Sequence, residues 1–241
     1  MYDRTVDERE LVFHVSGKLW QYSLVLKDQQ TGSLWSQILG KCMEGELLGK
    51  QLKMYPSVIT DWQTWRMKYP DSTVSSLNIL SLAYKREYYS KNPKRLLIGM
   101  AAGAHRAKAW AFDQLLKEPV VNDEFGDRPL VIFFNPVAGS AKIFDPRLDD
   151  QLLEFEYREG QIFDVQTGST WDDVSGTARE GPLAGKRLKS KLGIVSFRRA
   201  WDAFYRSCEY WESDLDSPLP GQPQAPSAGG PDSSAGEPPD E

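Results

Sequence analysis

The residues best suited to chemistry lie in a stretch that occurs twice. Asp28-Gln-Gln-Thr-Gly-Ser-Leu-Trp35 is repeated as Asp164-Val-Gln-Thr-Gly-Ser-Thr-Trp171. Each copy places a carboxylate and two hydroxyls beside an indole ring, as sites for sugars and other polar ligands do. The candidate ligand-binding residues of the two copies are Asp28, Thr31, Ser33, Trp35, Asp164, Thr167, Ser169 and Trp171. The alternative is a structural turn, which we favour, because Asp caps its own backbone, Gly adopts a positive φ and Trp enters the core.

The repeat extends beyond this motif. From Asp28 to Leu52 the second copy follows at a constant offset of 136 residues, and 13 of the 25 positions are identical. Such self-similarity indicates a duplicated structural unit. Tyr2-Asp3 aligns with Phe144-Asp145, yet residues 95–143 have no counterpart before Met1. We therefore expect the first unit to lack its opening strands, although a naturally shorter unit is the alternative.

Hydrophobic periodicity predicts an α+β fold dominated by antiparallel strands. In the first half we expect strands at Glu10–Val15, Leu19–Leu26, Leu34–Ile38 and Leu52–Ile59, with a break at Ser16–Lys18. One helix should follow, capped by Thr60 and with Trp62, Trp65 and Tyr69 on one face; in the second copy Ser196 is the expected cap. Each unit would then be a small β-meander closed by one aromatic-faced helix.

Further strands are expected in the second half. They are Leu96–Met100, an edge strand at His105–Trp110, Val120–Val121, Pro129–Phe134 and Ala141–Phe144. The predicted organisation is a first unit at 1–93, a second at 94–213 and a tail at 214–241. The tail has six acidic residues, no Lys or Arg and seven of the fifteen prolines, so we expect it to be disordered.

Charge and composition exclude several classes of function. The net charge of −5 comes from the tail, so the remainder is nearly neutral and has no basic stripe for nucleic acid. No run of about 18 apolar residues is present to span a membrane, and the polar start Met1-Tyr-Asp-Arg4 is unlike a signal peptide. Cys42 and Cys208 fit no metal-binding spacing, so they are two buried thiols or one disulfide. We predict no cofactor, no metal and a monomer that binds a small molecule or a protein.

Other polar residues give weaker signals. Asn122-Asp123, followed by Gly126, is interpreted as a β-turn between strands. The functional alternative is a polar contact in a cleft between the units. His14 and His105 have no partner at ligand or general-base spacing. If Asp172 and Asp173 lie on a strand, they point to opposite sides of it, which argues against a paired acid/base site. We therefore assign no catalytic residue and leave enzymatic activity open.

Five phrases together carry a family resemblance: Tyr2-Asp-Arg4, Val15-Ser-Gly17, Thr31-Gly-Ser-Leu-Trp-Ser-Gln37, Val121-Asn-Asp123 and Gly181-Pro-Leu-Ala-Gly185. The chain resembles the domain-of-unknown-function family 3179 of bacteria and archaea over nearly everything before the tail. That family has no established activity. Its members often carry a leader peptide, so the resemblance implies an extracytoplasmic location.

The resemblance also implies a chemical element that this sequence lacks. The family pattern has Cys-Pro-x-Cys just before the Tyr-Asp-Arg segment of the first unit, and the second unit reads Asn135-Pro-Val-Ala138 at the corresponding place. Two such thiols bind a metal or cycle through a disulfide. The leading hypothesis is therefore a non-catalytic binding or interaction module. The alternative is a metal- or thiol-dependent redox protein whose cysteine pair lies on a missing N-terminal segment.

Overall fold

The chain is rich in antiparallel β-structure and has few helices. The computed structural model describes residues 1–73, 91–103 and 105–215. Two sheets are formed by strands that are consecutive in the sequence. The first outer sheet contains β3 (Phe13–Trp20), β4 (Ser23–Asp28), β5 (Leu34–Ser36) and β6 (Lys41–Glu44). The second outer sheet contains β14 (Phe155–Arg158), β15 (Gln161–Asp164), β16 (Thr170–Trp171) and β17 (Ala178–Glu180).

Two inner sheets lie between the outer ones. The first inner sheet has the order β19 (Ile194–Phe197), β7 (Leu96–Ala101), β8 (Ala107–Ala111) and β20 (Cys208–Trp211). The second has the order β18 (Lys189–Ser190), β11 (Ser140–Asp145), β10 (Arg128–Asn135) and β9 (Val120–Phe125). Small hairpins are formed by β1 (Thr5–Val6) with β2 (Arg9–Glu10), and by β12 (Arg147–Leu148) with β13 (Gln151–Leu152).

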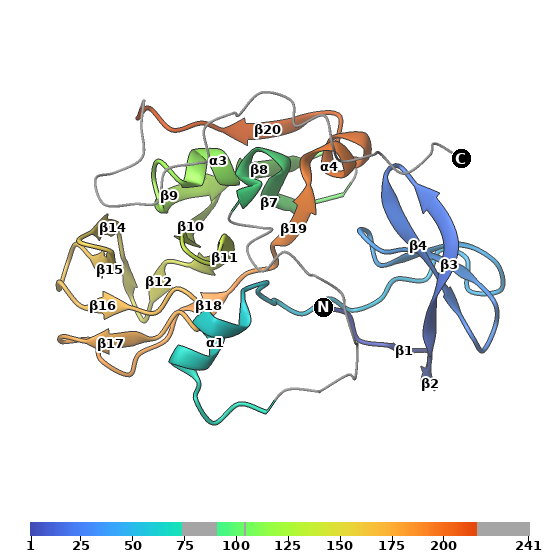
Figure 1. Ribbon diagram of the computed structural model, residues 1–241, viewed down its shortest axis with the longest axis horizontal. Helices are drawn as coiled ribbons and strands as arrows, with labels where there is room; N and C mark the ends of the chain where they lie inside the picture. Colours follow the sequence, from blue (N-terminus) through green and yellow to red (C-terminus); the bar gives the residue numbers. More distant parts are fainter. Residues whose placement is uncertain (74–90, 104, 216–241) are drawn as a thin grey trace.

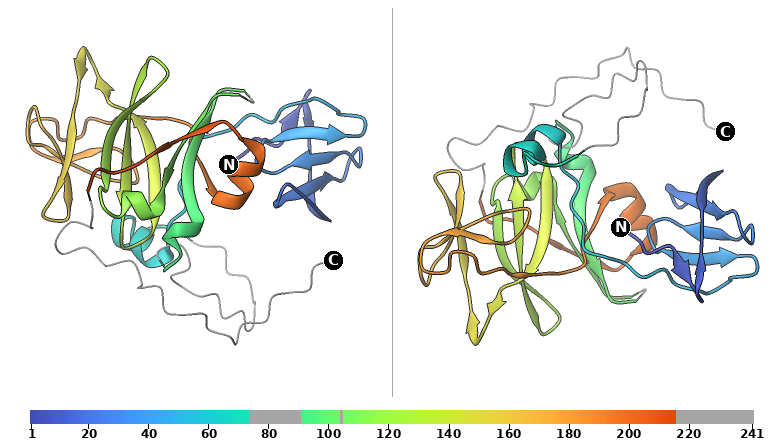
Figure 2. Two further views of the ribbon diagram at one scale, coloured as in Figure 1. Left: turned by 90° about the horizontal axis from the view of Figure 1, so that it is seen from above. Right: turned by 90° about the horizontal axis from the view of Figure 1, so that it is seen from below.

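Short helices connect and cover these sheets. They are α1 (Trp62–Lys68), η1 (Pro93–Arg95), α3 (Phe112–Leu115) and α4 (Arg198–Phe204). The layers follow one another as first outer sheet, α4, first inner sheet, second inner sheet and second outer sheet (Figures 1 and 2). Within the described part of the chain no helix is long and apolar enough to cross a membrane.

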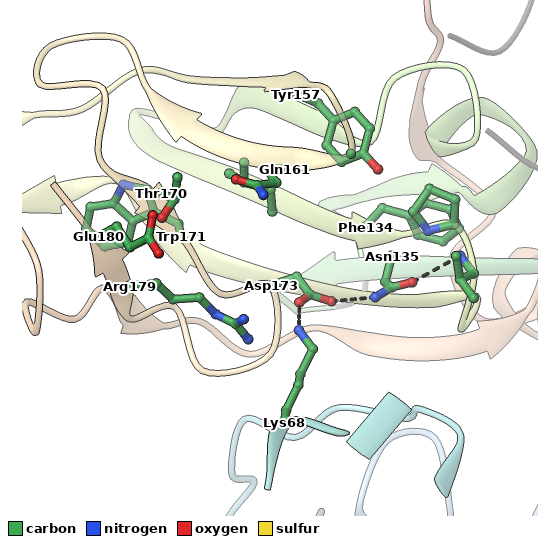
Figure 3. A pocket seen from close by; sticks show the side chains of 14 residues that line it. Lys68, Phe134, Asn135, Tyr157, Gln161, Thr170, Trp171, Asp173, Arg179 and Glu180 are labelled. Atoms are coloured by element: carbon green, nitrogen blue, oxygen red, sulfur yellow. Dashed lines mark hydrogen bonds and ion pairs between the residues drawn. The ribbon is translucent and has the colours of Figure 1, made fainter. Parts of the chain in front are cut away.

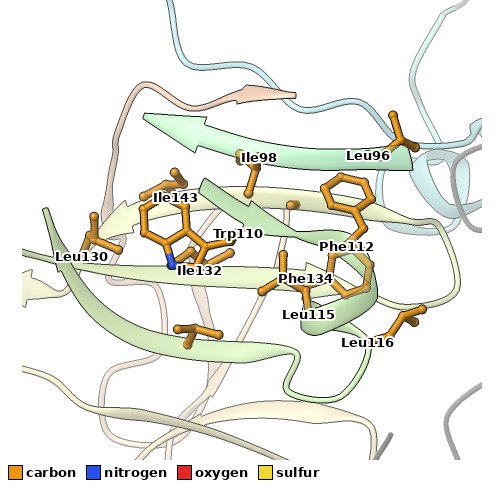
Figure 4. Packing of buried hydrophobic residues seen from close by; sticks show 12 residues of the cluster. Leu96, Ile98, Trp110, Phe112, Leu115, Leu116, Leu130, Ile132, Phe134 and Ile143 are labelled. Atoms are coloured by element: carbon orange, nitrogen blue, oxygen red, sulfur yellow. The ribbon is translucent and has the colours of Figure 1, made fainter. Parts of the chain in front are cut away.

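The largest hydrophobic core lies between the two inner sheets (Figure 4). Leu96, Ile98 and Trp110 of the first inner sheet face Ile132 and Ile143 of the second, and all five are almost completely buried. Side chains alternate along each strand, so the opposite face of each inner sheet is available to the next layer. Phe133 and Phe144 accordingly pack toward Phe155 and Trp171 of the second outer sheet. The opposite face of the first inner sheet packs on α4.

The two outer sheets share one register. Phe13 pairs with Asp28 as Phe155 pairs with Asp164, and Leu26 pairs with Trp35 as Ile162 pairs with Trp171. Glycines turn the corners in both sheets at the same relative positions, with φ of 61° at Gly40 and 69° at Gly176. Two residues that are 136 positions apart in the repeat are called sister positions.

Each helix of the repeat contacts the other half of the chain. α4 lies beside the first outer sheet, where Phe204 packs edge-on against Trp20 and also packs against the cluster that includes Ile38. α1 lies near β18 and the second outer sheet, and its Lys68 forms ion pairs with Asp172 and Asp173 (Figure 1). Lys68 and Phe204 are sister positions, as are Asp173 and Gln37. α4 also packs on the first inner sheet of its own half, whereas α1 reaches the second half through Lys68.

Several predicted boundaries in the first half are wrong. β3 runs through Ser16–Lys18 with a bulge between Val15 and Leu19, and the chain reverses instead at Gln21 and Tyr22. Both of these residues have positive φ, 51° and 60°, as a two-residue hairpin turn requires. Leu52–Ile59 forms one isolated bridge at Met54 rather than a strand.

The predicted helix caps are displaced by one residue. Asp61, not Thr60, caps α1, because its carboxylate accepts a hydrogen bond from the Thr64 backbone N–H at 2.9 Å. In the second half Ser196 belongs to β19, and Phe197 occupies the cap position of α4 without a side-chain capping hydrogen bond. A side-chain cap on α4 is not required because the helix is held by its packing on the first inner sheet.

Two predictions for the second half also need correction. The segment expected at an edge, β8, is an interior strand, since β7 pairs with one side and β20 with the other. Asn122 and Asp123 lie within β9 rather than in a turn, and the chain turns around Gly126, which has φ of 68°. The predicted tail lies outside the described residues beyond Leu215.

Candidate functional site

The repeated Asp-Thr-Ser-Trp stretches form two nearly identical hydrogen-bonded turns. Asp28 accepts from the Thr31 backbone N–H at 2.6 Å and from the Trp35 indole at 2.8 Å; Asp164 makes the same contacts to Thr167 and Trp171, at 2.6 and 3.0 Å. Ser33 and Ser169 are buried, and each hydroxyl accepts a backbone N–H, from Leu47 or Leu183. These contacts account for the polar side chains of the motif without a ligand.

Asn122 and Asp123 also make internal contacts. The Asn122 side chain hydrogen-bonds both backbone groups of Phe155, donating to its carbonyl oxygen at 2.7 Å and accepting from its N–H at 2.9 Å. Asp123 accepts from Lys108 at 2.8 Å and from the Trp110 indole at 2.9 Å. Asn122 thus joins the second inner sheet to the second outer sheet, and Asp123 joins the two inner sheets.

Charged and amide side chains converge instead on a cleft of about 320 Å³ beside the second outer sheet. Its wall comes from the β10–β11 turn, the β14–β15 hairpin and the loop after β16, and α1 contributes Lys68 from the other half of the chain (Figure 3). Polar lining residues are Lys68, Asn135, Gln161, Thr170, Asp173, Arg179 and Glu180. Aromatic surface comes from Phe134, Tyr157 and Trp171, so one residue of the repeated motif also lines the cleft.

Asp172 is the buried centre of the charged group. Its Oδ1 accepts backbone N–H groups of Val174 at 3.0 Å and Ser175 at 2.6 Å, which holds the loop after β16. Its Oδ2 accepts from Lys68 Nζ at 3.1 Å and forms an ion pair with Arg179 Nη2. The Asp172 side chain is 5% exposed and that of Arg179 is 52% exposed. One buried oxygen therefore holds two cationic groups side by side.

Asp173 completes the contact with α1. One carboxylate oxygen pairs with Lys68, and the other accepts from Asn135 Nδ2 at 3.0 Å (Figure 3). Asn135 Oδ1 accepts the backbone N–H groups of Val137 and Ala138, which fixes the β10–β11 turn. Asp172 and Asp173 lie after β16 ends, in a loop, so the expectation that they point apart on a strand is wrong. Both reach the same ammonium group.

The ionisation of the site follows from these contacts. Burial opposes the charge of Asp172, but the Ser175 N–H and the cations of Lys68 and Arg179 outweigh it and hold the pKa of Asp172 well below its usual value. Burial, with a smaller effect of the Asp173 charge, raises the pKa of Tyr157. The carboxylate of Asp172 is therefore ionised and the phenol of Tyr157 is neutral near neutral pH.

The first half of the chain contains the same frame without these charges. The sister positions of Asp172, Asp173 and Arg179 are Ser36, Gln37 and Met43, and that of Lys68 is Phe204. The Ser36 hydroxyl accepts the Leu39 N–H at 3.3 Å, as Asp172 Oδ1 accepts that of Ser175. A hydroxyl therefore suffices for the turn. The second oxygen of Asp172 and its two cations have no counterpart among the sister residues.

No local sequence pattern joins these residues. Lys68 lies 104 positions from Asp172, and its contact depends on the position of α1 beside the second half of the chain. A residue-by-residue comparison of the two copies would have indicated the site. The first copy has the uncharged Ser36, Gln37 and Met43 at the positions where the second copy has charged residues.

The two cysteines of the described chain lie apart from this cleft. Cys42 is buried in the first outer sheet, among Trp35 and Leu47, whereas Cys208 lies beside Trp201. Both thiols are free, and burial raises the pKa of each. The disulfide alternative for this pair is therefore wrong.

Comparison with known proteins assigns this β-rich chain, with its two matching outer sheets, to a family. The model of the family described as "Protein of unknown function (DUF3179)" matches residues 1–96 and again residues 84–209. The chain belongs to this family, and the two overlapping matches are consistent with the internal repeat. No curated protein and no solved structure matches the chain.

Proposed function

We propose that the protein is a non-catalytic binding module that takes a small polar ligand in the cleft at Lys68, Asp173 and Arg179. This proposal rests on one observation: the charged residues of the cleft have uncharged residues at their sister positions in the first half of the chain. A buried ion pair contributes little net stability compared with well-packed apolar residues. In the first half the turn forms with Ser36, and Phe204 makes an apolar contact with Trp20. The charged version therefore serves binding rather than folding.

The proposal includes the organisation of the chain as two homologous units. We infer units at 1–93 and 94–213, each contributing an outer sheet, with its helix covering the other unit and the tail at 214–241 beyond them. The ligand site then lies at a junction between units, where clefts commonly form. An extracytoplasmic setting is part of the same proposal and rests on the family resemblance.

The test exchanges the charged residues for their sister residues. The variant Lys68→Phe, Asp172→Ser, Asp173→Gln, Arg179→Met carries all four changes together, because removal of one partner alone would leave a buried charge unpaired. Wild type and variant are compared by thermal unfolding and by protein-observed NMR against a library of small anionic, cationic and neutral polar compounds. We expect the variant to fold with a melting temperature at or above that of wild type and to lose every ligand that perturbs the cleft.

Two outcomes would contradict the proposal. One is loss of several kcal/mol of stability in the variant, the amount expected when a required buried network is removed. The other is a wild-type protein whose cleft resonances respond to no compound of the library. The matched control is Arg158→Met, which removes an exposed Arg of the same outer sheet whose side chain is 54% exposed and lies over the Phe163 ring. It should leave ligand binding unchanged.

A further inference from the structure

We propose that the ligand of this cleft carries one oxyanion group, a carboxylate or a phosphate, which binds between Lys68 and Arg179. This inference rests on the proposed function and specifies the chemistry of its ligand. It starts from the convergence of two cationic groups on a single oxygen, Asp172 Oδ2. Their nitrogen atoms are neighbours because they share this acceptor.

The acidic partners of these cations are already engaged. Asp172 uses one oxygen for two backbone N–H groups and the other for two cations. Asp173 uses one oxygen for Lys68 and the other for Asn135. With their side chains 5% and 14% exposed, these carboxylates are largely withdrawn from solvent and serve to position the cations.

The remaining hydrogen-bonding capacity of the cluster consists mainly of donors. A guanidinium group has five N–H donors, and the described contacts of Arg179 use Nη2 alone. Lys68 has three donors and uses two on Asp172 and Asp173. Asn135 Nδ2 has two and uses one. A planar guanidinium beside an ammonium and an amide N–H matches a carboxylate or phosphate oxygen pair.

The charge of the cleft limits the ligand to one such group. Lys68 and Arg179 are balanced by Asp172 and Asp173, and Glu180 adds a further negative charge at the rim. Glu180 repels every anion, and a polyanion more strongly than a single oxyanion, which can still reach the 52% exposed Arg179 side chain from solvent. The partly exposed ring of Tyr157 lines the cleft and would contact the organic part of the ligand.

The test uses sodium acetate and inorganic phosphate as probes of the two anion types. Each is titrated into the full-length protein at constant ionic strength, with chloride as the balancing anion, and the cleft is followed by NMR at Asn135, Asp173 and Arg179. We expect saturable shifts in wild type and binding roughly ten- to a hundredfold weaker in Arg179→Met, because a charge-assisted hydrogen bond is lost. In this variant Asp172 keeps Lys68 and two backbone N–H groups as partners, so the protein should fold. Arg158→Met again serves as the control.

The outcomes separate this inference from the proposed function. If neutral or cationic library compounds perturb the cleft while acetate and phosphate do not, the oxyanion inference is overturned and the proposed function stands. If no compound of any charge perturbs it, both fall. Binding of the probes that is equally strong in Arg179→Met also overturns the inference. Tighter binding of acetate or of phosphate supports it and identifies the anion type.

Discussion

The indole ring of Trp201 lies directly on the backbone of Gly99. A Cβ added to Gly99 would stand 2.3 Å from Cζ2 of Trp201, closer than any two carbon atoms pack. Trp201 is completely buried between α4 and the first inner sheet. The glycine is thus required by the close approach of the helix rather than by its backbone conformation.

Gly99→Ala should consequently destabilise the protein. The added methyl group must displace a rigid ring, so we expect a loss of about 2–4 kcal/mol in the free energy of unfolding, measured by urea denaturation. Gly193→Ala is the matched control, because its new Cβ would meet the Cδ1 atoms of Ile98 and Ile143, at 2.8 and 3.0 Å, rather than a rigid ring. A loss at Gly99 no larger than that at Gly193 would show that α4 readily moves away from the sheet.

The cap of α1 gives a prediction that distinguishes two adjacent residues. Asp61→Ala removes the acceptor of the Thr64 N–H and should cost about 1 kcal/mol. Thr60→Val should be neutral or stabilising, because within the described residues the buried Thr60 Oγ1 has no hydrogen-bond partner. Thermal unfolding of the two variants checks both values. A larger loss in Thr60→Val than in Asp61→Ala would restore Thr60 as the cap.

Acid should weaken the protein through Asp145. Burial raises the pKa of this carboxyl, but hydrogen bonds from Arg147 and Lys191 outweigh burial and lower the pKa to about 2. Because the folded pKa is below the unfolded value, this stabilisation is present above about pH 4 and disappears as the pH falls toward 2. Asp145→Asn should cost on the order of 1–2 kcal/mol at pH 7 and nearly nothing near pH 2.

Urea unfolding of the wild type and the Asp145→Asn variant at several pH values provides the measurement. Asp150→Asn, at an exposed aspartate of the same segment, serves as the control. If the difference in the free energy of unfolding between wild type and Asp145→Asn stays constant from pH 7 to pH 2, the stabilising role of the ionised Asp145 is contradicted.

The two repeated Asp-Thr-Ser-Trp turns predict a measurable energetic coupling between Asp164 and Trp171. Asp164→Ala leaves the buried indole N–H without its acceptor, which should cost about 2–3 kcal/mol. Trp171→Phe has no indole N–H that needs an acceptor. The double variant Asp164→Ala, Trp171→Phe should therefore lose about 1–2 kcal/mol less stability than the sum of the two single losses. The cycle at Asp28 and Trp35 should give a similar value. Additive losses in both cycles would show that the hydrogen bond contributes nothing.

Local residue chemistry predicted the parts of the fold that depend on neighbouring residues. The repeated turns follow from Asp, Gly and Trp within eight positions, and the strands Leu96–Met100 and Pro129–Phe134 follow from continuous apolar runs. The hairpin at Gln21–Tyr22 was missed because neither residue is a typical residue for positive φ. Gly17, a stronger local signal, lies in a bulge instead.

The candidate site depends on contacts between distant segments, which no local pattern encodes. Lys68 lies on the predicted helix without any local sign of a site, and Asp172 is one of two adjacent acids. Their meeting depends on α1 covering the other half of the chain. The interior position of β8 was likewise missed, because its second neighbour, β20, follows about 100 residues later and pairs in parallel.

The two outer sheets repeat one register within a single chain, so a substitution in one sheet leaves the other unchanged. In a dimer of identical subunits, a charged residue introduced at one interface also appears at the other, and the desolvation cost is incurred twice. Within one chain, Phe204 can pack against Trp20 while Lys68, at its sister position, forms ion pairs with Asp172 and Asp173. A repeat within one chain thus lets a charged site form in one copy alone.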